Sequence, residues 1–223
     1  MKRSANVLAL LLWLFLVGMV LADSAPPDDL DRQIQLATSL FDQGHTVESK
    51  KIFESLLAEL QSGTPSIQPG FVLNELSKIA AATGDYKAAI QLAKQSGSAY
   101  HDVRDIGGES HSLNNEGIAE IQMGQYGPAQ QTLEAALVLS RRAQDTENQV
   151  QVLNNLGSAY YFPGSYSDAM VRCDEAMALL TKTSRQNGAT TGAKLLASTG
   201  RRWISAWADT RMHCRLSRGR TII

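Results

Sequence analysis

The sequence predicts an all-α protein, a right-handed solenoid of about four helix hairpins. One observation is a repeat with a period of 40 residues, in which a similar tetrapeptide returns in one register at Leu73-Asn74-Glu75-Leu76, Leu113-Asn114-Asn115-Glu116 and Leu153-Asn154-Asn155-Leu156. A second observation is that a glycine, a tyrosine and an alanine follow each tetrapeptide at fixed spacing. A third is the low aromatic content of 6%, which is more typical of packed helices than of sheets. A fixed period of this length indicates stacked repeats.

Apolar residues at helical spacing predict two helices in each unit, here taken in chain order. The first unit, residues 30–69, is degenerate. Its first helix is expected to end at Gly44 and its second before the Ser-Gly-Thr-Pro segment that begins at Ser62. In the second unit, residues 70–109, we expect helices at about 71–83 and 86–98.

The last two units follow the same plan. In the third, residues 110–149, the first helix is expected to end near Met123 and the second to begin beside Pro128, because proline is tolerated in a first helical turn. The fourth, residues 150–189, is expected to contribute to a helix pair at about 146–162 and 167–182.

The residues that recur at the 40-residue spacing have physical roles. Three glycines end the first helix of a hairpin, where the chain reverses and glycine adopts positive φ at low cost; these are Gly84, Gly124 and Gly164. Small residues in facing positions allow two helix axes to approach closely; these are Ala89, Ala129, Ala169, Gly117 and Gly157. Asp105 and Asp145 precede helices and are expected to be N-caps.

The two ends of the chain differ in character from the repeats. Residues 1–22 are predicted to be a signal peptide, because Lys2 and Arg3 precede an apolar run from Val7 to Leu21. Residues 23–29 form a polar linker. The sequence therefore predicts an exported protein, periplasmic or secreted, and the alternative is a membrane anchor formed by an uncleaved signal.

The C-terminal segment, residues 190–223, is basic and has lost the repeat register. It is interpreted either as a capping helix or as a truncated or frame-altered end. Cys214 lies in it, and export would permit a disulfide with Cys173. Because Cys173 occupies a core position of its repeat, a buried thiol is the favoured prediction and the disulfide is the alternative.

These residues carry a family resemblance over about Leu30 to Thr183. The 40-residue pattern resembles the tetratricopeptide repeat (TPR), in the Leu-Asn-Asn-Leu-Gly type found in kinesin light chains and in bacterial proteins that join such arrays to a caspase-like CHAT domain. Two residues depart from the pattern: Glu116 stands where a leucine is expected, and Ser77 where a glycine is expected.

The sequence contains no recognisable catalytic set, and we expect no enzyme activity. Nucleophile-elbow, phosphate-loop, dinucleotide and zinc-protease motifs are absent, and the four histidines are dispersed. We therefore expect neither a metal nor another cofactor, and no small-molecule substrate. From Asp23 to Ala189 there are 12 Lys and Arg against 21 Asp and Glu, a balance that argues against nucleic acid as a partner.

The resemblance implies that the first helices of the units line a concave groove. Its groove positions correspond to Gln35, Glu75, Lys78, His111, Asn115, Gln122, Gln151, Asn155 and Ser158. In related arrays the asparagine equivalent to Asn115 and Asn155 contacts the backbone of a peptide, since an amide side chain both donates and accepts hydrogen bonds. The alternative is that the asparagines satisfy neighbouring backbone groups or one another.

Three functional hypotheses follow. The first is a non-enzymatic scaffold that binds an extended peptide or a partner protein in the groove. The second is the regulatory TPR region of a larger, CHAT-type protease-like protein without its catalytic domain. The third is an array that only self-associates through an apolar face at its end, because each hairpin must stack to bury such a face.

Overall fold

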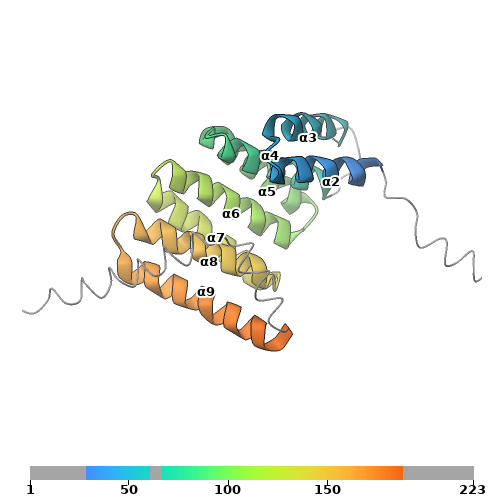
Figure 1. The fold of residues 1–223 in the computed structure, drawn as a ribbon. Coiled ribbons are helices and arrows are strands. Elements are labelled where there is room, and N and C mark those ends of the chain that lie inside the picture. The colour runs from blue at the N-terminus through green and yellow to red at the C-terminus, as the bar shows by residue number, and fades with distance from the viewer. Residues whose placement is uncertain (1–28, 61–66, 188–223) are drawn as a thin grey trace, which may run out of the picture.

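The computed structural model of the chain describes residues 29–60 and 67–187, and every regular element in these two ranges is an α-helix. The helices follow one another along a stack (Figure 1). Their bounds are α2 Asp29–Asp42, α3 Thr46–Leu60, α4 Gln68–Ala82, α5 Tyr86–Asp102, α6 Ile106–Gln122, α7 Tyr126–Arg142, α8 Thr146–Tyr161 and α9 Tyr166–Asn187. The prediction of an all-α protein built from four hairpins is confirmed.

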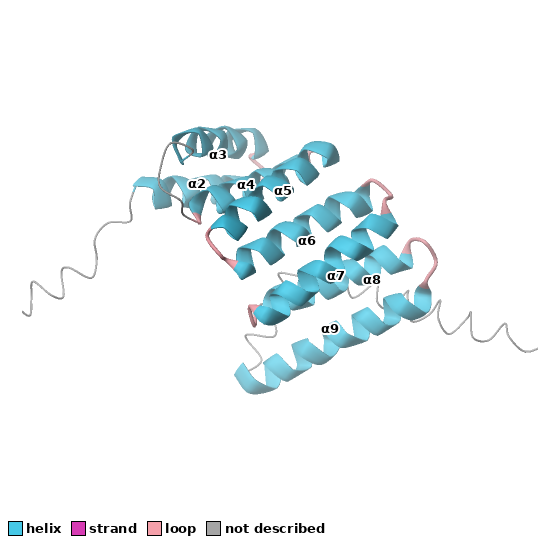
Figure 2. Ribbon diagram, turned by 180° about the vertical axis from the view of Figure 1, so that it is seen from behind, coloured by secondary structure: helices cyan, strands magenta, loops and turns pink. Residues whose placement is uncertain are grey.

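Each hairpin pairs one A helix with one B helix. The A helices are α2, α4, α6 and α8, and the B helices are α3, α5, α7 and α9. Every helix packs against the helices that precede and follow it, and the A helices also contact one another, α2 with α4, α4 with α6 and α6 with α8. The view from behind shows the same stacked order (Figure 2).

The turns inside the hairpins use the expected glycines. Gly44, Gly84, Gly124 and Gly164 have φ values of 86°, 85°, 73° and 93°. A side chain is strained in this region of backbone conformation, and glycine is not. The sequence prediction for these turns is confirmed.

The two described turns between hairpins, which follow α5 and α7, are built differently, because a non-glycine residue adopts the left-handed conformation in each. Arg104 has a φ of 60° and Gln144 a φ of 57°. The next residue in each case is a predicted N-cap: Asp105 accepts a hydrogen bond from the Gly108 amide at 3.0 Å, and Asp145 accepts one from the Asn148 amide at 3.0 Å. These bonds satisfy backbone N–H groups that have no partner within the helix.

The apolar core forms two clusters. One spans α2, α3 and α4 and includes Phe53, Leu56 and Ile79; the other spans α6 to α9 and includes Leu137, Leu153 and Leu156. The two clusters lie at successive places along the stack, and no fully buried member of either comes from α5.

Close approach of A and B helices depends on the small residues that the repeat predicts. Ala89, Ala129 and Ala169 are fully buried. A methyl group on Gly117 would lie 2.5 Å from Cγ of Leu133, and one on Gly157 would lie 2.8 Å from Sγ of Cys173. The predicted packing role of these residues is confirmed.

The serine that replaces the repeat glycine keeps the packing intact through a hydrogen bond. Ser77 is buried, and its hydroxyl donates to the Ala89 carbonyl on α5 at 2.8 Å. Ser49, which replaces the repeat alanine, donates to the Ala37 carbonyl at 2.7 Å. A hydroxyl at a helix interface is tolerated when it bonds a carbonyl of the facing helix.

Several predicted segments lie outside the described residues. These are the signal peptide, nearly all of the linker, and the basic C-terminal segment with Cys214. Within residues 29–60 and 67–187, no helix is long and apolar enough to cross a membrane.

We predict that Gly117→Ala destabilises the protein by about 1–3 kcal/mol, because the Leu133 side chain must move to admit the methyl group. Gly127→Ala is the matched control. A methyl group there meets nothing within 4 Å, and helix propensity alone favours alanine by up to ~1 kcal/mol. Urea unfolding of both variants checks the prediction, and equal effects at the two glycines would contradict it.

Candidate partner-binding face

The predicted groove positions lie on one side of the A helices. In α6, residues 111, 115, 118 and 122 recur every three or four positions and therefore share a helix face. The equivalent positions in α4 and α8 form parallel stripes, because these helices contact α6 on either side. We call this set the A-helix face; its members are Glu75, Lys78, His111, Asn115, Ile118, Gln122, Gln151, Asn155 and Ser158.

The asparagines of the A-helix face form hydrogen bonds between successive A helices. Nδ2 of Asn115 donates to Oδ1 of Asn74 at 2.8 Å, and Nδ2 of Asn155 donates to Oδ1 of Asn114 at 2.8 Å. The two bonds join α6 to α4 and α8 to α6 in the same way. We call them the asparagine clamps.

The clamps match the alternative interpretation of the asparagines, in which these side chains satisfy one another. An asparagine amide carries two N–H groups and one oxygen. Each clamp uses one N–H of Asn115 or Asn155, so the second N–H and the oxygen of these half-buried side chains are not used by it. Their contact with a ligand stays a prediction.

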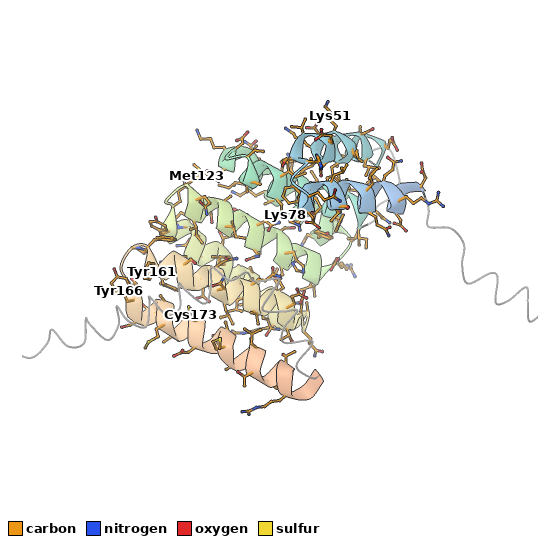
Figure 3. All side chains as sticks on the ribbon, in the orientation of Figure 1. Lys51, Lys78, Met123, Tyr161, Tyr166 and Cys173 are labelled. Atoms are coloured by element: carbon orange, nitrogen blue, oxygen red, sulfur yellow. The ribbon has the colours of Figure 1, made fainter. Side chains whose placement is uncertain are left out.

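The basic side chain on the A-helix face is neutralised within its own helix. Nζ of Lys78, which is labelled in Figure 3, lies 2.9 Å and 2.8 Å from the two carboxylate oxygens of the buried Glu75. This internal ion pair leaves little positive charge with which to hold a free carboxylate.

His111 binds the N-cap of the following A helix. Its Nε2 lies 3.0 Å from Oδ2 of Asp145, which caps α8. The hydrogen bond from His111 holds the pKa of Asp145 below its usual value, burial opposes this, and the capped backbone amides add to the lowering. Sequence reasoning assigned Asp145 a capping role only, since the two residues are 34 positions apart.

Gln122 and Gln151 remain available on the A-helix face. Neither side chain forms a hydrogen bond or ion pair within the described part of the chain. Ser158 donates to the Asn154 carbonyl at 3.3 Å, and Gln35, on α2, is exposed.

Exposed apolar side chains lie at the ends of two stripes of the A-helix face. Ile67 precedes the stripe on α4, and Phe162 follows the stripe on α8 and stacks on Tyr126.

The described residues hold no group of three or more His, Cys, Asp or Glu side chains that could bind a metal. Cys173 is buried in α9, as its position in the repeat predicts (Figure 3). Burial raises the pKa of its thiol to about 11. Because the thiolate is the nucleophilic form, this thiol is poorly suited to catalysis.

We predict that Asn155→Ala lowers the free energy of unfolding by about 1 kcal/mol, through loss of a clamp between hairpins. Asn154→Ala is the matched control, because its side chain has no hydrogen-bond partner in the described ranges. Both changes gain the same helix propensity. Urea unfolding with circular dichroism measures the difference, and an equal stability of the two variants would refute the clamp.

Comparison with known proteins supports the fold through structure alone. The chain matches no known protein-family model and no curated protein. TPR-like repeats of a Podosopora anserina kinesin light chain are 18% identical and align with a TM-score of 0.59, over 87% of this chain and 95% of that one.

Two Rap proteins are similar in shape as well. The Rap protein complexed with competence and sporulation factor is 13% identical and aligns with a TM-score of 0.60, over 82% of this chain and 55% of that chain. The Rap conjugation gene regulator of the plasmid pLS20, in complex with the Phr* peptide, is 13% identical and aligns with a TM-score of 0.60, over 84% of this chain and 53% of that chain. The chain has the fold of a TPR-like repeat solenoid.

Proposed function

We propose that this protein is a non-enzymatic scaffold that binds an extended peptide, or an extended segment of a partner protein, across the A-helix face. The observation that carries the proposal is the alignment of amide side chains on adjacent helices, in which Gln122 and Gln151 have no hydrogen-bond partner in the described part of the chain. Amides that both donate and accept can bond the backbone of an extended chain whatever its sequence.

The asparagine clamps support this proposal, because they orient two of the amides before a ligand binds. One N–H of Asn115 and one of Asn155 are already used between hairpins, which fixes the orientation of both amides. Side chains that are ordered before binding lose less conformational freedom when a ligand arrives. The asparagines therefore present a preorganised row, and the unpaired glutamines add adaptable contacts beside it.

Peptide binding by a protein of similar shape supports the class of partner. The Rap regulator of pLS20 was solved in complex with a peptide. The acidic balance of the repeats and the Glu75–Lys78 pair both disfavour nucleic acid and a free C-terminal carboxylate as the principal ligand.

Localisation forms part of the proposal. We propose export to the periplasm or the exterior, on the basis of the N-terminal apolar run, with an uncleaved membrane anchor as the alternative. The alternative function, a regulatory TPR region of a CHAT-type protease, stays a prediction. The genomic sequence beyond Ile223 tests it, and a downstream α/β domain with catalytic His and Cys would support it.

We predict that peptides selected from a phage-displayed random library against this protein lose about tenfold or more in affinity for the Gln122→Ala/Gln151→Ala variant. The physical reason is the loss of two unpaired amides from the A-helix face. Isothermal titration of synthetic peptides measures the effect.

The control is Gln91→Ala/Gln131→Ala, which removes two exposed glutamines from the B helices α5 and α7. Its affinity for the same peptides is expected to stay unchanged. Peptides that lose affinity only for this control variant would place binding on the B helices and overturn the proposal.

A further inference from the structure

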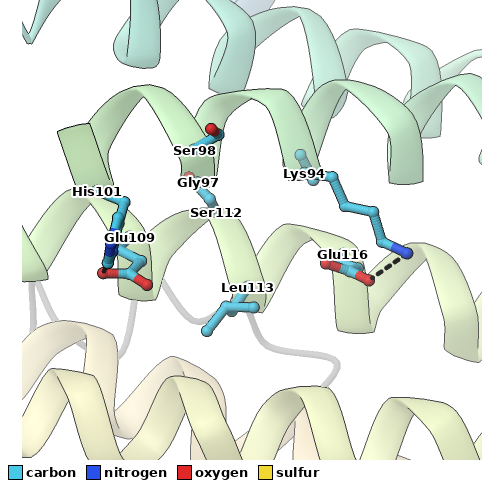
Figure 4. Close-up of a pocket in the computed structure, with 9 residues that line it drawn as sticks. Lys94, Gly97, Ser98, His101, Glu109, Ser112, Leu113 and Glu116 are labelled. Carbon is cyan, nitrogen blue, oxygen red and sulfur yellow. Dashed lines mark ion pairs between the residues drawn. The ribbon is translucent and has the colours of Figure 1, made fainter.

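A cavity of about 300 Å³ lies between the second and third hairpins, away from the A-helix face. We call it the α5–α6 cavity (Figure 4). Two antiparallel helix stripes line it, one from α5 and one from α6: Ala93, Lys94, Gly97, Ser98, His101, Glu109, Ser112, Leu113 and Glu116. In α6 the lining residues occupy a different helix face from Asn115 and Gln122, so a ligand here would not compete with one on the A-helix face.

The cavity exists because the residues at this junction are smaller or more polar than those at the equivalent positions of the other junctions. At the junction between the third and fourth hairpins, the positions equivalent to Gly97, Ser112 and Glu116 hold Leu137, Val152 and Leu156, and all three are fully buried. At the first junction, two of the equivalent positions hold Val72 and Leu76, which are also buried. Large apolar side chains thus fill the neighbouring junctions, whereas small and polar side chains leave this one hollow.

The side chains around the cavity are paired across α5 and α6. Nζ of Lys94 lies 3.3 Å from a carboxylate oxygen of Glu116, and Nδ1 of His101 lies 3.5 Å from one of Glu109 (Figure 4). The Lys94 side chain is 63% exposed, while that of Glu116 is only 9% exposed. The exposed Lys94 ammonium can return to water when another cation takes its place beside the buried Glu116 carboxylate, which needs a positive partner.

In α7, the side chains at the positions of Lys94 and His101 form ion pairs with the next B helix. Glu134 and Arg141 take the positions of Lys94 and His101, and they form ion pairs with Arg172 and Glu175 of α9. Those ion pairs bridge one B helix to the next. In the described residues no ion pair or hydrogen bond joins α5 to α7, and the exposed Lys94 and His101 stand at the edge of the cavity.

Glu120 extends the acidic stripe of α6 by one turn beyond Glu116. Glu120 is only 7% exposed, and its Oε2 is buried with no hydrogen-bond partner among residues 29–60 and 67–187. Burial raises the pKa of its carboxyl, a hydrogen bond from Thr132 opposes this, and the nearby Glu116 carboxylate raises it further. Buried carboxylate oxygens are normally bonded, so Oε2 of Glu120 retains the capacity to accept a hydrogen bond.

From these observations we infer that the α5–α6 cavity is a binding site for an alkyl guanidinium group, held by the carboxylates of Glu116 and Glu120. Glu109 and Glu116 line the cavity together with Lys94 and His101, and Glu120 follows Glu116 by one turn of α6. Because Glu109 is paired with His101, the carboxylates of Glu116 and Glu120 stand against the single ammonium of Lys94, and this charge balance favours a further cation. A guanidinium has a planar fork of donors that can serve two carboxylates at once, which an ammonium cannot match. Ala93 and Leu113 supply an apolar wall for the alkyl stem.

The two sources of this group are a free small molecule and an arginine side chain of a peptide. The test is an NMR titration of the ¹⁵N-labelled full chain with butylguanidine, with its neutral isostere butylurea, and with acetyl-Gly-Arg-Gly-amide. We expect saturable shifts of the backbone amides of Gly97, Ser112 and Leu113 with butylguanidine and none with butylurea. Tighter binding of the peptide than of butylguanidine identifies a partner's arginine as the source, and the reverse identifies a free ligand.

Variants locate the site. Glu116→Gln and Glu120→Gln are each expected to weaken butylguanidine binding by about tenfold, because each removes a charge-assisted hydrogen bond. Glu54→Gln is the matched control, since Glu54 occupies the position equivalent to Lys94 on α3 and is paired with Lys50 on the surface. Its binding should equal that of the unaltered protein.

Gly97→Leu provides a second, independent variant. It restores the residue of the next junction, and a methyl group at Gly97 already makes an ordinary contact at 3.6 Å from Ser112. It should abolish butylguanidine binding while the protein keeps its helical circular dichroism. Equal shifts with butylurea, no saturable shift with butylguanidine or the peptide, or unchanged binding by Glu116→Gln would each overturn the inference.

Discussion

Burial of apolar faces between consecutive hairpins is the constraint on which the rest of the structure depends. A single hairpin leaves one face uncovered, and in the third and fourth hairpins that face is covered by stacking, as the fully buried Leu137, Leu153 and Leu156 show. Each such side chain contributes roughly 1.5–3 kcal/mol when it leaves water. Small residues such as Gly117 and Ala129 are needed because the helices must approach closely enough to exclude water.

The same stacking determines which polar groups remain for a partner. Because the A helices contact one another, Asn115 and Asn155 reach Asn74 and Asn114 and join the hairpins by hydrogen bonds. Residues on a face proposed for binding thus also stabilise the array. A variant at an asparagine would therefore mix an effect on stability with one on binding, whereas Gln122 and Gln151 separate the two.

The sequence predicts the features that depend on neighbouring residues and on the 40-residue register. It identifies the glycine turns, the caps at Asp105 and Asp145, and the buried Cys173, because each follows from local geometry or from a repeat position. It does not predict the contacts that depend on how two distant helices are placed, such as His111 with Asp145 or Asn155 with Asn114. Glu116 departs from the repeat pattern in the sequence, yet its pairing with Lys94 and the adjoining cavity follow only from the packing of α5 against α6.

Paramagnetic relaxation measures most directly whether the A-helix face is the binding surface. A selected peptide carrying a nitroxide would be added to the ¹⁵N-labelled protein, and the broadening of each backbone amide would be recorded. Our account predicts the strongest broadening along α4, α6 and α8, around Lys78, Gln122 and Gln151, and much weaker effects on the outer surfaces of α5, α7 and α9. Broadening concentrated on those B helices, with the A helices unaffected, would contradict it.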